Sequence, residues 1–165
     1  MTPITRTTGT ERELLESALD QARADLVGTV RGLSETDARR RLVPSLTTPI
    51  ALIKHATFAE RMWFQRTLGR LADADCDGPL WPHGGFRVGE EETVAGVIAE
   101  FERAGARARS VAAGFGLEET REHPRRGVVS LRWMYLFMTA EFARHAGHGD
   151  ILREQIEAGR DSSAT

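Results

Sequence analysis

Apolar residues recur at steps of three and four along almost the whole chain, and this period constrains the fold more than any other feature. Such a period is typical of an amphipathic helix that turns one face to a core. The first run consists of Leu15, Leu19, Ala22, Leu26, Val30 and Leu33. It predicts a helix of roughly 23 residues. A second helix is expected to start at Thr47-Thr48-Pro49, where a capping hydroxyl precedes a proline, and to last to about Leu68.

Two further long helices complete the pattern. The third is predicted over about 91–115, on a stripe made of Val94, Val97, Phe101, Ala104, Ala108, Val111 and Phe115. The fourth follows a capping Ser130 and is expected to last to about Ala158, with a polar tail from about Gly159. A short turn is expected over 39–43, and neither an alternating strand pattern nor an internal repeat is found. The sequence therefore predicts an all-α fold, in which residues 1–165 form a single four-helix bundle domain.

The segment between the second and third helices is too long for a tight turn between antiparallel neighbours. It spans about 71–89 and is rich in helix-breaking residues: Gly78, Pro79, Pro82, Gly84, Gly85 and Gly89. Loops of this length inside a compact domain are often functional, or cross over along a bundle. We therefore expect a long crossover loop here. A second loop is expected over 116–129, around Pro124 and Gly127.

Composition excludes several classes of function. The 22 basic and 24 acidic residues give a formal charge of -2, which provides no electrostatic field for nucleic acid. The single cysteine, Cys76, can form neither an internal disulfide nor a thiolate metal cluster. No run of consecutive apolar residues is long enough to span a membrane. The first residues lack the apolar core of a signal peptide, so we expect a cytoplasmic protein.

The last predicted helix carries polar residues on the seam that should face the core. The seam alternates steps of three and four through Leu131, Met134, Met138, Glu141, His145, His148 and Leu152. Its ends are apolar, but its middle is a carboxylate and two imidazoles. An ionised carboxylate buried without a partner destabilises a fold, so these groups need a partner or a function. Glu141 and His145, at i and i+4, direct two ligand atoms at one point, as helix-borne metal sites do.

A third ligand should come from another helix, and His55 lies on one. It is in line, at steps of three and four, with the apolar residues Leu52, Ala59 and Met62. It is therefore expected to face inward. The remaining histidines, His83 and His123, fall in the two loops. His55, Glu141 and His145 thus form a candidate three-ligand set, and such a set with an open fourth position is typical of catalytic zinc.

The spacing alone leaves other interpretations open. His145 and His148, at i and i+3, are also a usable pair of ligands, so the spacing does not decide which three residues bind. Glu141 could instead pair with Arg144 or with an arginine of the first helix. A single inward histidine such as His55 is more often a hydrogen-bonded core residue than a ligand.

Three segments resemble one family. The last helix, from Ser130-Leu131-Arg132-Trp133 through Glu141-Phe-Ala-Arg-His145-Ala-Gly-His148-Gly-Asp150 to Glu154, resembles the final helix of DinB-like proteins. More closely, it is similar to their mycothiol-dependent S-transferase branch. The second helix, with Leu52-Ile-Lys-His55 and Glu60-Arg-Met-Trp63-Phe64, resembles the same branch, as does Phe86-Arg-Val-Gly-Glu-Glu-Glu-Thr93. The similarity covers nearly the whole chain in the same order.

The resemblance implies a four-helix bundle with a divalent metal at its centre. In much of the superfamily the ligands are three histidines, two of them four residues apart on the last helix. Here the earlier member of that pair is Glu141, a replacement also found in the mycothiol-dependent isomerase branch, and the later member is His145. His55 matches the ligand of the second helix. His148 falls where many members carry glutamine, so the resemblance places it beside the metal, where it could orient a ligand or handle a proton.

The activity implied is transfer of the sulfur of mycothiol, a low-molecular-weight thiol, to a small electrophile. The thiol would be activated as a metal-bound thiolate, most simply on Zn²⁺, with Ni²⁺ an alternative. The same site would equally serve a metal-dependent hydrolase or isomerase, and a fourth protein ligand would indicate a non-enzymatic metal-binding bundle. An open position beside a cleft lined by Trp81 or Phe86 would favour an enzyme. A homodimer is a further expectation, since related bundles often pair.

Overall fold

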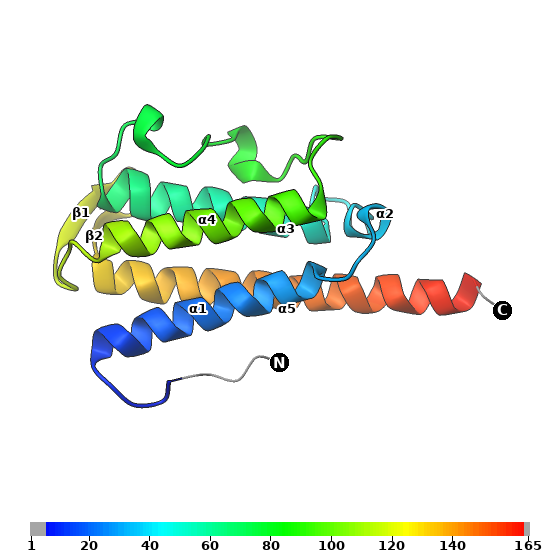
Figure 1. Ribbon diagram of the computed structural model, residues 1–165, viewed down its shortest axis with the longest axis horizontal. Helices are drawn as coiled ribbons and strands as arrows, with labels where there is room; N and C mark the ends of the chain where they lie inside the picture. The colour runs from blue at the N-terminus through cyan, green and yellow to red at the C-terminus, as the bar shows by residue number, and fades with distance from the viewer. Residues whose placement is uncertain (1–5, 164–165) are drawn as a thin grey trace.

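The computed structural model describes residues 6–163, and long helices make up most of it (Figure 1). The long segments are α1 (Glu11–Val30), α3 (Pro49–Glu60) with its continuation η1 (Arg61–Leu68), α4 (Val94–Ala112) and α5 (Leu131–Ser163). The shorter elements are α2 (Glu35–Ala38), η2 (Asp73–Asp75), η3 (Pro82–Gly85), β1 (Thr120–His123) and β2 (Gly127–Ser130). The predicted all-α architecture with four long helical segments is confirmed.

The long segments pack as two layers. Figure 1 shows α1 beside α5 and α3 beside α4, with the chain between η1 and α4 running back along the outside of the second layer. The predicted crossover loop is therefore present. The α1–α5 contact is close, because a Cβ on Gly149 would lie 2.5 Å from Oγ1 of Thr29. Only glycine allows the two backbones to approach this far.

Hydroxyl side chains cap the starts of the long helices. Each accepts a hydrogen bond from a backbone N–H of the first turn, which otherwise has no partner in the helix. The caps are Thr10 for α1, Thr48 for α3, Thr93 for α4 and Ser130 for α5. Thr10 also forms a capping box with Glu13. The start of each helix therefore follows from local sequence, as was predicted for Thr48 and Ser130.

One apolar core lies between the layers. Leu19, Leu26, Phe64, Phe101 and Phe142 are at most 2% exposed. Full burial of such a side chain contributes about 1.5–3 kcal/mol. The apolar stripes recognised in the sequence thus form the buried core of the bundle.

The structure corrects three details of the prediction. Residues of the second loop form the antiparallel hairpin of β1 and β2, with Thr120 opposite Ser130 and His123 opposite Gly127. Strands of four residues are too short to show an alternating pattern. The short turn lies earlier than expected, as α2, because Ser34 caps it. The last helix continues through Ser163, so the residues after Gly159 begin as helix rather than as a polar tail.

The second helix reaches Leu68 as predicted, but its last part, η1, is a π-helix. Its wider turn is visible where the Gly69 N–H donates to the Phe64 carbonyl, five residues earlier. Two buried side chains of η1, Arg61 and Gln65, both donate to Oδ1 of Asp77 in the crossover loop. The π-helical segment therefore holds the beginning of that loop.

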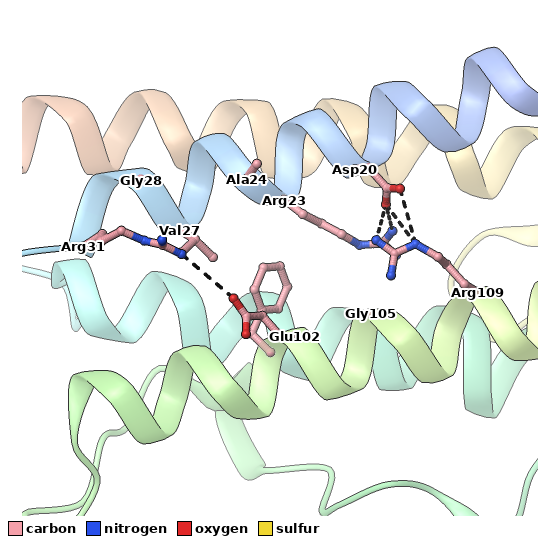
Figure 2. Close-up of a pocket in the computed structure, with 10 residues that line it drawn as sticks. Asp20, Arg23, Ala24, Val27, Gly28, Arg31, Glu102, Gly105 and Arg109 are labelled. Atoms are coloured by element: carbon pink, nitrogen blue, oxygen red, sulfur yellow. Dashed lines mark hydrogen bonds and ion pairs between the residues drawn. The ribbon is translucent and has the colours of Figure 1, made fainter. Parts of the chain in front are cut away.

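The face between α1 and α4 carries an open groove of about 510 Å³. Figure 2 shows small residues along it, Ala24 and Gly28 from α1 and Gly105 from α4, and an ion pair between Asp20 and Arg109 at one end. None of the candidate ligands His55, Glu141 and His145 lines this groove.

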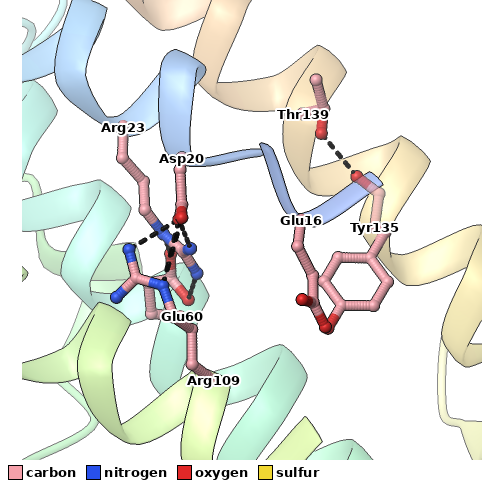
Figure 3. Close-up of polar contacts among 7 residues, drawn as sticks. All are labelled: Glu16, Asp20, Arg23, Glu60, Arg109, Tyr135 and Thr139. Carbon is pink, nitrogen blue, oxygen red and sulfur yellow. Dashed lines mark hydrogen bonds and ion pairs between the residues drawn. The ribbon is translucent and has the colours of Figure 1, made fainter. Parts of the chain in front are cut away.

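A buried ion pair forms the wall behind this groove. Arg23 donates through Nε and Nη2 to the two carboxylate oxygens of Glu60, at 2.7 and 3.0 Å, and through Nη1 to Asp20 (Figure 3). Glu60 is fully buried. This network ties α1 to α3. Each of its charges meets an opposite charge, so none of its cations is left over for a ligand.

Within residues 6–163, no helix has the length and apolar character to cross a bilayer.

Candidate metal centre

Three side chains from two helices converge at one point. His55 comes from α3, and Glu141 and His145 come from successive turns of α5. One ligand atom from each lies within 4.8 Å of the other two. Oε1 of Glu141 is 3.1 Å from Nε2 of His145 and 3.9 Å from Nε2 of His55. The structure thus brings together the three residues that the sequence and the resemblance singled out.

The donor set fits a divalent cation. Zinc ligands lie about 2.0–2.1 Å from the ion in a tetrahedron, which places neighbouring donors about 3.4 Å apart. The separations of 3.1 and 3.9 Å bracket that value. The other ring nitrogen of His145, Nδ1, is buried and has no hydrogen-bond partner among the described residues. The ring of His145 therefore makes its polar contact through Nε2, the nitrogen that faces Glu141.

The crossover loop fixes the orientation of His55. Nδ1 of His55 lies 2.7 Å from the carbonyl oxygen of Gly84, so the proton of the neutral ring resides on Nδ1 and is donated to that carbonyl. The lone pair of Nε2 then faces Glu141. The ring of Phe86 stacks on His55 with centroids 4.3 Å apart. Metal-binding histidines commonly have such a carbonyl partner behind them.

The surroundings of His145 favour the neutral imidazole. Burial and the neighbouring imidazole of His55 lower the pKa of His145 below its ordinary value, against the opposing effect of Glu141. A neutral imidazole is the form that binds a metal. The second carboxylate oxygen of Glu141 accepts a hydrogen bond from the exposed side chain of Arg144, at 3.2 Å. The contact with Arg144, considered from the sequence as an alternative for Glu141, therefore coexists with the cluster.

His148 lies beside this cluster but outside it. Its ring is 5.7 Å from the ring of His145, measured between centroids, and the residue is exposed. The expectation that the whole seam faces the core is therefore wrong at this position. A straight α-helix has 3.6 residues per turn, so a seam of period 3.5 drifts around it. The buried face of α5 passes instead through Phe142 and Gly149, where the helix meets α1.

The other candidate residues occupy different places. His83 is exposed in the crossover loop, whereas His123 stacks on Trp63 at the hairpin end of the bundle. Phe86 adjoins the cluster, but Trp81 packs under the cationic groups of Lys54 and Arg61.

The sequence analysis missed the role of one backbone group, the Gly84 carbonyl. The signal that could have suggested it is the pair Gly84-Gly85, because adjacent glycines in a long loop permit close approach to a helix. Both have positive φ, +66° and +78°.

Comparison with known proteins gives one result on the family. The model of a family described as Mycothiol-S-transferase matches residues 14–158, which include the cluster and most of every long helix. A comparison with curated proteins finds no match.

Proposed function

Because the chain belongs to the mycothiol S-transferase family, we propose that it transfers the sulfur of mycothiol to a small carbon electrophile at a metal held by His55, Glu141 and His145. The observation that supports the metal centre most strongly is the convergence of three ligand atoms from two helices. Two imidazoles and one carboxylate satisfy a divalent cation only in part, since they leave it a net charge of +1 and an open position.

The residues of the site have separate roles in this proposal. Glu141 and His145 would bind the metal from one helix, α5, and His55 would supply the third ligand from α3 in the opposite layer. A divalent cation bound there lowers the pKa of an entering thiol and so supplies a thiolate nucleophile at neutral pH. In the reaction a carbon–sulfur bond forms, and the leaving group departs with its electron pair. No cysteine of the protein is required, and Cys76, its single cysteine, is not a member of the cluster.

His148 is the proposed proton acceptor for the entering thiol. It is exposed, and it lies one turn beyond His145 on the same helix. No hydrogen bond joins it to Glu141 or His145 among the described residues, so its ring is free to exchange a proton with a substrate or with water. An imidazole open to solvent can accept a proton from a thiol and pass it to water.

Metal analysis combined with a thiol-transfer assay tests the proposal. Purified protein should contain about one divalent ion per chain and should accelerate the reaction of mycothiol with a chloronitrobenzene or a similar generic electrophile. His145→Ala should lose both properties. His123→Ala is the matched control, because it also removes an imidazole but lies at the hairpin, and it should keep its metal. Transfer that is unaffected by complete metal removal would disprove the metal-dependent mechanism.

A further inference from the structure

Lys54 is a buried cation next to a candidate ligand, and the proposed reaction does not use it. It is the only lysine among the 22 basic residues of the chain, and it is 5% exposed. Its Nζ lies 2.6 Å from Oε2 of Glu92 and 4.7 Å from the ring centre of Trp81. A cation is buried only where such partners replace water, so these contacts define a specific position for the side chain.

Both partners of Lys54 lie in the chain between η1 and α4, on either side of Gly84. Trp81 precedes Gly84 by three residues, and Glu92 follows it by eight. The same oxygen of Glu92 accepts a hydrogen bond from the N–H of Gly89, at 2.6 Å. Lys54 therefore attaches to α3 both ends of the loop segment that carries the Gly84 carbonyl.

The segment between these two attachments lies directly on the α3 backbone. A Cβ on Gly85 would be 3.0 Å from the carbonyl oxygen of Lys54 and 3.3 Å from the Trp81 ring. A Cβ on Gly84 would be 3.3 Å from Nδ1 of His55. The glycines thus permit an approach that brings the Gly84 carbonyl within 2.7 Å of the His55 ring.

We propose that Lys54, Trp81 and Glu92, here called the loop clamp, are positioning residues for His55. The clamp holds the Gly84 carbonyl against Nδ1, which keeps the ring proton there and leaves the lone pair of Nε2 aimed at Glu141. The consequence for metal affinity rests on the proposed function, whereas the effect on His55 itself does not. Lysine suits this position because its compact ammonium group fits between a carboxylate and an indole, where a planar guanidinium needs more room.

The first test examines the ring in the protein without metal. Nitrogen NMR of the histidines at a pH where imidazole is neutral reports which ring nitrogen carries the proton. His55 should carry it on Nδ1 in the parent protein. In Lys54→Met and in Glu92→Gln it should be shared between the two nitrogens. Arg87→Met is the matched control, because it removes one positive charge from an exposed position of the same loop, and it should behave like the parent.

The second test measures the dissociation constant for Zn²⁺ by competition with a chromophoric chelator, and the visible spectrum of the Co²⁺-loaded protein. Loss of a partner that orients a ligand typically weakens metal binding about 10–100-fold. Both clamp variants should show this loss with an altered Co²⁺ spectrum, and Arg87→Met should not. The double variant Lys54→Met with Glu92→Gln leaves no unpaired buried charge. It should recover melting temperature without recovering metal affinity.

The outcomes separate the clamp from the proposed function. An unchanged His55 proton position in both clamp variants overturns the clamp, whatever happens to metal affinity. Affinity that recovers together with melting temperature in the double variant also overturns it, because the effect is then one of stability. A parent protein that binds no divalent metal refutes the proposed function, and the proton position of His55 then decides the clamp alone.

Discussion

Removal of the metal should lower the melting temperature of the protein without unfolding it at ordinary temperature. An ion that binds only the folded chain stabilises it by about 2.7 kcal/mol when its free concentration is 100 times its dissociation constant. For chains of about 150–250 residues, each kcal/mol shifts the melting temperature by about 2–4 °C. The expected loss on chelation is therefore about 5–11 °C. The bundle should stay folded because its core is closed by residues such as Leu26, Phe64 and Phe142, none of which is a ligand.

Variants of the three candidate ligands test whether this shift in melting temperature arises from metal bound at the cluster. His55→Ala and His145→Ala each remove one of three donors, so neither should retain stoichiometric metal, and chelation should no longer change their melting temperature. Glu141→Gln should show an intermediate shift, because an amide oxygen can still coordinate but carries no charge. Each tenfold weakening of binding removes about 1.4 kcal/mol of the stabilisation.

Scanning calorimetry with and without a chelator, paired with metal analysis of each variant, measures the effect. Circular dichroism of the metal-free samples checks that they remain helical. Full metal content in both histidine variants would refute the ligand assignment. A metal-free parent protein that is unfolded would refute the reasoning in another way, because the site would then be structural rather than catalytic.

Three further predictions concern single positions. His148→Ala should keep its metal but change turnover or the affinity for the thiol, and unchanged steady-state kinetics would remove its proposed role. Arg23→Met should cost about 3–5 kcal/mol in urea unfolding, because it leaves Glu60 buried and unpaired, whereas neutralising both residues should be close to neutral. Gly149→Ala should cost about 1–3 kcal/mol, since its methyl group would overlap side-chain atoms of α1. Gly147→Ala, on the open side of the same helix, should stabilise the protein, and equal effects at the two glycines would contradict the packing argument.

The fold could be predicted because its main signals are local. Apolar stripes at helical spacing and capping hydroxyls such as Thr48 and Ser130 act within a few residues of one another. The hairpin could not be predicted in the same way. Its strands of four residues are held by pairing across the turn at Gly127. The prediction that the last helix ends at about Ala158 is wrong, because Gly159 continues the helix instead of ending it.

Two of the three candidate ligands also follow from local geometry. Glu141 and His145 share one helix, and the i, i+4 spacing alone brings them together. His55 required the further step that an inward residue of a second helix meets them, and the structure places it there. His148 shows the limit of this reasoning. A heptad spacing describes positions on a seam, but the close contact of α5 with α1 at Gly149 decides which positions are buried.

Because Glu141 and His145 come from α5 and His55 comes from α3, we expect the two groups of ligands to respond differently to substitutions elsewhere in the protein. The relative position of Glu141 and His145 is set within one turn of α5, so distant changes should leave it intact. The position of His55 relative to that pair depends on how α3 packs against α5, and its ring orientation depends on the Gly84 carbonyl in the crossover loop. Substitutions in the loop should therefore act on the site mainly through His55, which the loop contacts through the Gly84 carbonyl and the Phe86 ring. Under the proposed function, variation in that loop should change metal affinity, and variation on the exposed flank of α5 around His148 should change the choice of substrate.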